Sequence, residues 1–124
     1  MAWEYEDVEV IRVIDGDSAV LRVTKTLDFG FRVLQTISYR ENFRLYGINT
    51  PEIRGVSASE LKRGVDAKNE LARLLGLGAI RITTYKPDKY GRWLADIYVR
   101  TEAGDEIHVN QTLVDGGHAV PYNG

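Results

Sequence analysis

The chain of 124 residues contains no cysteine, a single methionine, and only two histidines, His108 and His118. Without cysteine the protein has no disulfide bond, no thiol nucleophile and no thiolate metal site. Two histidines are also too few for a histidine-rich zinc site. Any metal ion would therefore be held by oxygen ligands, which favours calcium, magnesium or manganese.

Long hydrophobic runs and an excess of positive charge are missing too. No apolar stretch approaches the roughly 20 residues that a membrane helix needs, so we expect no membrane partner. Residues 1–7 are acidic and lack the basic and apolar regions of a signal peptide. We expect a cytoplasmic protein if the chain is complete, and a secreted one if a signal peptide has been removed. The net charge of −2 argues against a large phosphate-binding surface but allows a few arginines to bind one phosphate.

Five stretches have the β-branched runs or the period-two alternation of apolar residues that predict strands. They are residues 8–14, 18–24, 31–48, 79–85 and 93–99. We expect a bulge at Glu41 and Asn42 within the third strand. Length and composition indicate a single domain over residues 1–124, with no repeat or linker.

Two helices are expected between and after these strands. Ser57 and Glu60 have the spacing of a capping box, which predicts a helix that runs to about Leu75. The residues expected on its apolar face are Leu61, Val65, Leu71, Ala72 and Leu75. Asn110 is expected to cap a short helix that ends at two consecutive glycines. The whole order predicts an α+β, mainly β, fold: a five-stranded oligonucleotide-binding (OB) fold barrel with a helix between strands three and four.

Three polar turns follow predicted strands: Asp15 with Asp17, residues 49–52 (Asn-Thr-Pro-Glu), and residues 88–92 (Asp-Lys-Tyr-Gly-Arg). Turns at strand ends are where a small barrel exposes functional side chains. Together with Arg44, these turns offer carboxylates for a hard cation, a carboxylate for a general base, and two arginines. That combination suits phosphodiester hydrolysis, because cation and arginines neutralise charge on phosphorus while the base activates water.

Each turn alone also has an ordinary structural explanation. An Asp-Gly-Asp sequence is a common turn, residues 49–52 could be the loop that enters the helix, and residues 88–92 have the composition of a simple hairpin. The basic residues of the long helix are expected to form a solvated face.

The order of the motifs resembles the staphylococcal nuclease, or thermonuclease-like, family over about residues 10–122. The matching blocks are residues 13–18 (VIDGDS), 44–52 (RLYGINTPE), 64–71, 88–95 (DKYGRWLA) and 109–117 (VNQTLVDGG). The resemblance implies a single thermonuclease-like OB-fold domain over residues 1–124. It also implies calcium-dependent cleavage of DNA and RNA.

The family's catalytic positions match residues of this chain. The resemblance implies that Arg44 and Arg92 contact the phosphate and steady the developing charge, and that Glu52 activates the attacking water. Tyr90 and Tyr122 are expected to contact nucleotides by stacking or hydrogen bonding.

The family's metal position is also matched, with one departure. The resemblance implies that Asp17 binds the metal, that the Thr50 carbonyl oxygen reaches it, and that Asp15 lies close to the ion. The best-known members have aspartate where this chain has Asn49. An amide oxygen can coordinate calcium, but the lost charge predicts weaker binding or a shift towards Mg²⁺ or Mn²⁺.

Two further departures concern the outline of the domain. The hairpin from Lys25 to Glu41 is longer than in the family, and we expect it to extend over the site or to form a partner contact. The sequence ends at Gly124, where the founding member continues into a third helix. Either that helix is dispensable, or another surface covers the exposed part of the barrel, as self-association would.

The sequence therefore leaves three functional hypotheses. The first is a metal-dependent nuclease acting on DNA and/or RNA as a monomer or weak homo-oligomer. The second is a non-catalytic OB-fold module that binds nucleic acid or protein and has a degenerate metal site at Asn49. The third is a structural interaction domain that uses the long hairpin as an oligomerisation arm.

Overall fold

The computed structural model describes residues 2–87 and 89–122. Its elements are β1 (Trp3–Asp15), β2 (Ser18–Asp28), β3 (Leu34–Leu45), β4 (Ile48–Asn49), α1 (Ala58–Leu75), β5 (Gly78–Pro87), β6 (Trp93–Thr101), β7 (Glu106–His108), α2 (Val109–Asp115) and β8 (Val120–Pro121). The acidic N-terminal residues that the sequence left outside the first strand are part of β1 from Trp3 onward. No helix in the described ranges is long and apolar enough to cross a membrane.

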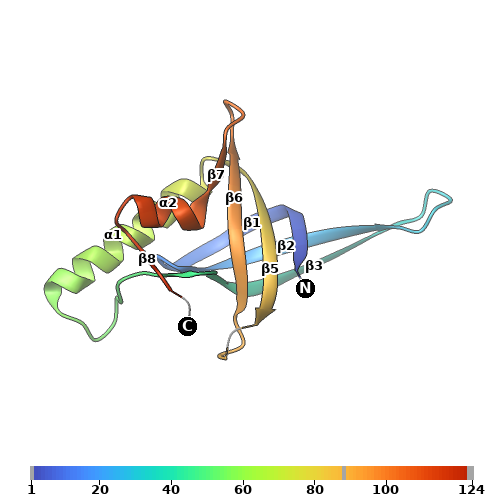
Figure 1. The fold of residues 1–124 in the computed structure, drawn as a ribbon. Helices are drawn as coiled ribbons and strands as arrows, with labels where there is room; N and C mark the ends of the chain where they lie inside the picture. Colours follow the sequence, from blue (N-terminus) through green and yellow to red (C-terminus); the bar gives the residue numbers. More distant parts are fainter. Residues whose placement is uncertain (1, 88, 123–124) are drawn as a thin grey trace.

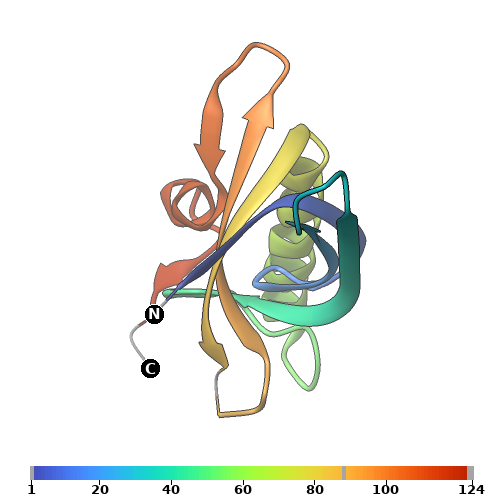
Figure 2. The same cartoon turned by 90° about the vertical axis from the view of Figure 1, so that its right-hand side faces the viewer.

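Five strands close into a barrel in the order β3-β2-β1-β5-β6, with antiparallel neighbours. The closing pair is parallel and joins β3 to β6, where Phe43 pairs with Trp93 and Leu45 with Ala95. β7 adds to the outer edge of β6, and β4 pairs with β8. Figure 2 shows the strands wrapped around a common centre, with α2 beside β6 and β7. The predicted α+β OB-fold barrel, with a helix between its third and fourth strands, is confirmed.

The barrel core follows from the alternation of apolar residues. In β6 the side chains of Ala95, Ile97 and Val99 are fully buried, while the residues between them are only partly covered. β2 repeats the pattern, with Leu21 and Val23 buried. Burying one such large aliphatic side chain contributes roughly 1.5–3 kcal/mol, so the alternation dictates which face of each strand turns inward.

α1 begins where the capping box predicted. The Ser57 Oγ accepts a hydrogen bond from the Glu60 backbone N–H at 3.4 Å, and Gly76 ends the helix. Its buried residues are Gly64, Ala67, Leu71, Leu74 and Leu75. The expected burial of Leu61, Val65 and Ala72 is therefore wrong: these side chains are exposed. The N-terminal half of the helix buries its small residues instead, because they allow the closest approach to the barrel.

The predicted cap of the short helix is also wrong. His108 is the N-cap of α2, and Asn110 lies inside the helix and is buried. The Asn110 amide accepts a hydrogen bond from the Ile97 N–H and donates to the carbonyl oxygens of Ala95 and Tyr46. Its side chain therefore fastens α2 to β6 and to the segment after β3, which is a tertiary role that a local capping signal cannot reveal.

β2 and β3 continue beyond the barrel as a long two-stranded ribbon, seen projecting away from the helices in Figure 1. Their register runs unbroken from Ser18 opposite Arg44 to Asp28 opposite Leu34. The bulge predicted at Glu41 and Asn42 is absent from this register, because each residue pairs one-to-one with β2. At about 3.3 Å per residue, the tip lies about 30 Å from the barrel end that carries Arg44, so the ribbon does not cover that end.

The ribbon has two unlike faces, because residues opposite each other in an antiparallel pair share a face. Hydroxyl groups line one face, where Thr24 contacts Ser38 at 3.1 Å and Thr26 contacts Thr36 at 3.4 Å. The register places apolar side chains on the other face: Leu27, Phe29, Val33, Ile37 and Tyr39. All five are between 39% and 59% exposed within the single chain.

Candidate active site

The three polar turns meet at one end of the barrel, where they line a cleft of about 890 Å³. Its walls come from the β1–β2 turn, from the segment that follows β3, and from the β5–β6 turn. All nine side chains singled out in the sequence line it: Asp15, Asp17, Arg44, Asn49, Thr50, Glu52, Tyr90, Arg92 and Tyr122. Asp88, which opens the third polar turn, lies outside the described residues.

A buried ion pair forms the floor of the cleft. Arg44 Nη1 donates to Asp17 Oδ2 at 3.0 Å, and the two side chains are only 11% and 10% exposed. The same carboxylate oxygen accepts the Thr50 backbone N–H at 3.1 Å. The pairing of Ser18 with Arg44 in the β2–β3 ladder places the arginine beside Asp17. Removing one partner of such a pair leaves an uncompensated buried charge, at a cost of roughly 3–5 kcal/mol.

The other end of the Arg44 guanidinium holds the segment that follows β3. Nη2 donates to the Ile48 carbonyl oxygen and to Asn49 Oδ1, each at 3.1 Å. The guanidinium carbon also lies 5.5 Å from the centre of the Tyr122 ring. Arg44 therefore connects Asp17, Asn49 and Tyr122, which come from three separate parts of the sequence.

The residues expected at a metal site offer oxygen donors only. Asp17 Oδ1 accepts no hydrogen bond from the described residues, while Asp17 Oδ2 and Asn49 Oδ1 already accept from Arg44. No group of three His, Cys, Asp or Glu side chains in the described ranges is arranged to hold a metal. Two carboxylates, Asp15 and Asp17, together with neutral oxygens fit a hard cation such as calcium by donor chemistry, but with little negative charge to hold it.

The parallel closure of the barrel determines where the second arginine lies. Arg44 pairs with Leu94 across β3 and β6, and Arg92 precedes Leu94 by only two residues. The guanidinium carbon of Arg92 lies 5.5 Å from the centre of the Tyr90 ring, and Lys89 Nζ lies 5.3 Å from it. The β5–β6 turn thus brings cations and an aromatic ring to the same cleft as the Asp17 turn.

Glu52 is exposed and lies in the loop between β4 and α1. Two glycines allow α1 to approach this region closely. A Cβ on Gly64 would stand 2.7 Å from the Glu52 carbonyl oxygen and 3.0 Å from that of Pro51. A Cβ on Gly16, in the β1–β2 turn, would stand 2.6 Å from Ala67 Cβ on α1. α1 therefore supports both the carboxylate turn and the Glu52 loop from behind.

The cleft also contains residues that were not singled out in the sequence, chiefly Tyr46 and Lys86. Tyr46 packs against Tyr85, with ring centres 4.7 Å apart. The Tyr85 hydroxyl donates to Asp96 Oδ2 at 2.7 Å, and this hydrogen bond, followed by burial, raises the pKa of Tyr85 above its usual 10.0. Tyr46 follows Arg44 by two residues, and in a strand this spacing places both side chains on one face. The spacing was therefore the sequence signal that could have placed Tyr46 beside Arg44 in the cleft.

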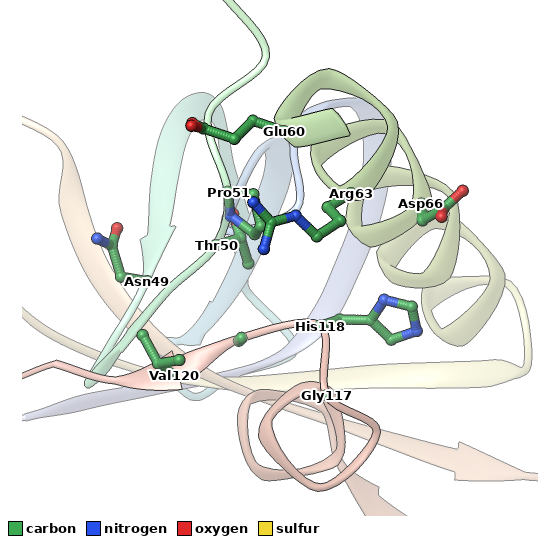
Figure 3. Close-up of a pocket in the computed structure, with 10 residues that line it drawn as sticks. Asn49, Thr50, Pro51, Glu60, Arg63, Asp66, Gly117, His118 and Val120 are labelled. Atoms are coloured by element: carbon green, nitrogen blue, oxygen red, sulfur yellow. The ribbon is translucent and has the colours of Figure 1, made fainter. Parts of the chain in front are cut away.

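A second hollow, of about 530 Å³, lies on the other side of the segment from Asn49 to Pro51. Figure 3 shows Arg63 extending from α1 over this hollow, with His118 on the opposite wall. Glu60 and Asp66 also line it. The segment that carries Asn49 and Thr50 thus lines both recesses, and of the two only the larger one is lined by Arg44, Glu52 and Arg92.

Comparison with known proteins adds independent findings. The model of the family described as staphylococcal nuclease homologue matches residues 42–123. The probable staphylococcal-like nucleases CAN3 and CAN2 of Oryza sativa subsp. japonica are 27% and 26% identical over 107 residues, which is 85% of this chain and 26% and 27% of those proteins. Staphylococcal-like nuclease CAN1 of Arabidopsis thaliana is 26% identical over 99 residues, covering 76% of this chain and 28% of that protein. The chain thus spans about a quarter of the length of these curated relatives.

Proposed function

The chain belongs to the staphylococcal nuclease homologue family, and from that membership we propose that it is a metal-dependent nuclease that hydrolyses phosphodiester bonds in DNA and/or RNA. The observation that carries the proposal is the presence of Arg44, Glu52 and Arg92 around one open cleft at the end of the barrel. Three relatives whose names include the word nuclease support it.

Each group in the cleft suits one part of the reaction. Glu52, exposed on the cleft wall, accepts a proton from the attacking water as the general base. Arg44 and Arg92 stabilise the negative charge that develops in the phosphorane-like transition state, because a guanidinium stays charged and can bind two phosphate oxygens. The ion pair with Asp17 holds Arg44 in place before substrate arrives, so little reorganisation is needed.

The metal ion in this proposal is Ca²⁺, with Mg²⁺ or Mn²⁺ as substitutes because Asn49 is neutral. Asp17, Asn49, the Thr50 carbonyl and Asp15 would hold it. When bound, the ion would neutralise charge on the scissile phosphate. Tyr90 and Tyr122 are proposed to contact the nucleotides on either side of that phosphate.

A cleavage assay tests the proposal. Calcium and single-stranded DNA should give acid-soluble product, and Glu52→Gln or Arg92→Ala should each lower the rate roughly 10²–10³-fold, the usual effect of removing one group that stabilises transition-state charge. Glu102→Gln and Arg100→Ala are matched controls, since they make the same changes at exposed positions outside the cleft. Parent-like rates in both cleft variants would show that the site assignment is wrong.

The second hypothesis, a non-catalytic binding module, is favoured by the composition and hydrogen bonding of the proposed metal position. Asn49 is neutral and already bonded to Arg44, and the described residues contain no three-ligand metal group. Binding of an oligonucleotide that weakens with salt, together with no cleavage in any divalent cation, would support that hypothesis against the nuclease.

A further inference from the structure

Tyr46 is an aromatic residue of the cleft wall whose backbone is held by hydrogen bonds to other parts of the fold. Its backbone N–H donates to the Ala95 carbonyl oxygen at 2.8 Å, and its own carbonyl oxygen accepts from Asn110 Nδ2 at 3.0 Å. The next residue, Gly47, accepts the Tyr122 N–H at 2.8 Å. The backbone under the Tyr46 ring is therefore tied to β6, to α2 and to the C-terminal segment.

The side chain of Tyr46 is supported as well. Its ring leans on Tyr85 with an interplanar angle of 39°, and Tyr85 is itself held by its hydrogen bond to Asp96. Asp96 Oδ1 lies 2.8 Å from His108 Nε2 at the start of α2. Although it packs against Tyr85, Tyr46 is 48% exposed, and it lines the same cleft as Arg44.

We propose that Tyr46 is a stacking platform for one unpaired nucleobase of the substrate, bound next to the phosphate at Arg44. This inference rests on the proposed function. An aromatic ring that is rigid, half-exposed and next to a phosphate-binding arginine can hold a base by its π-face, whatever the base's identity. Because the platform is fixed before binding, little side-chain entropy is lost when a base stacks on it.

Equilibrium binding in EDTA tests the platform without any need for cleavage. The probes are a fluorescein-labelled oligothymidylate and an oligonucleotide of the same length with abasic residues throughout, read by anisotropy. Tyr46→Leu should weaken binding of the oligothymidylate roughly 5- to 150-fold, the range of stacking losses per base, and leave the abasic strand unchanged. Tyr46→Phe should keep parent affinity. Tyr39→Leu, which changes an exposed tyrosine outside the cleft, should alter neither.

The possible results separate this inference from the nuclease proposal. Equal losses for both probes in Tyr46→Leu, no loss for either, or no discrimination between the probes by the parent would each overturn the platform. Base-dependent binding through Tyr46 in a protein that never cleaves would uphold the platform and contradict the nuclease. Cleavage by a protein whose binding does not change in Tyr46→Leu would support the nuclease and contradict the platform. A melting temperature for Tyr46→Leu near that of the parent shows that the variant is folded.

Discussion

Arg44 binds three polar partners at once, and the charge of each partner affects what the cleft can hold. Nη1 donates to the charged carboxylate of Asp17, whereas Nη2 donates only to the neutral oxygens of Ile48 and Asn49. A carboxylate at position 49 would still lie beside Arg44 while adding one negative charge to the metal position. A substitution at Asn49 is therefore the most direct test of where a metal ion binds in the cleft.

We predict that Asn49→Asp strengthens calcium binding at least about tenfold, because the added carboxylate attracts the ion at close range. The gain stays below the full Coulomb energy, since the new charge also pairs with Arg44. Isothermal titration calorimetry of the parent and the variant measures the effect. Asn69→Asp adds the same charge at an exposed position of α1 and should leave the affinity unchanged. Unchanged affinity in Asn49→Asp would place the ion away from residue 49.

At the scale of elements, α1 acts as a support for the cleft as well as a cover for the barrel. Gly64 and Ala67 are buried where the helix meets the Glu52 loop and the β1–β2 turn. The carbonyl oxygen of Glu52 is so near Gly64 that no side chain fits between them without a backbone shift. The position of the proposed base thus depends on a helix residue that never contacts substrate.

Gly64→Ala should lower the cleavage rate roughly 10- to 100-fold by displacing the Glu52 loop, since misplacing a catalytic group by about 1 Å has an effect of that size. Alanine favours the helix by about 1 kcal/mol relative to glycine, and this gain offsets part of the cost of the displaced loop. The free energy of unfolding should therefore change little, while the cleavage rate falls. The measurements are the steady-state rate and the urea midpoint. Asn69→Ala improves helix propensity at an exposed site and should leave the rate unaltered. A parent-like rate for Gly64→Ala would mean that α1 does not position Glu52.

The elements also show where local sequence signals are sufficient. Ser57 starts α1 as predicted, because a cap and its helix are neighbours in the chain. The buried face of α1 and the role of Asn110 were mispredicted, because both depend on contacts between elements distant in sequence.

At the scale of the whole molecule, the barrel and the ribbon are differently supported. The barrel strands close on themselves and share one core, whereas the outer ribbon is a two-stranded sheet with an exposed apolar face. A ribbon of this kind is marginally stable alone. The hypothesis that it serves as an oligomerisation arm stays a prediction, and the alternative that it covers the site is wrong.

Stability of the whole fold should fall at alkaline pH. The hydrogen bond to Asp96 raises the pKa of Tyr85, and burial raises the pKa of Tyr98. A raised folded pKa means that the folded state holds its proton more tightly than the unfolded chain. The resulting stability is therefore complete below the usual value of 10.0 and is lost progressively above it.

Urea unfolding between pH 8 and pH 11 measures this dependence. Tyr85→Phe should show a shallower loss of stability above pH 10 than the parent, because one of the two phenols with a raised pKa is gone. Tyr39→Phe removes an exposed phenol on the ribbon and should keep the parent slope. Equal slopes for the parent and Tyr85→Phe would contradict the assignment.

By itself, the sequence determined the number of barrel strands and their order along the chain, the start of α1, and nine of the residues that line the cleft. These features follow from local periodicity, from capping chemistry and from motifs that the family shares. Only the tertiary structure decided that Arg44 pairs with Asp17 and that Gly64 supports the Glu52 loop. It also decided that Tyr46 packs against Tyr85 and lines the cleft. Such contacts join residues that are far apart in the sequence or lie on different elements, and they leave no periodic trace in any one segment.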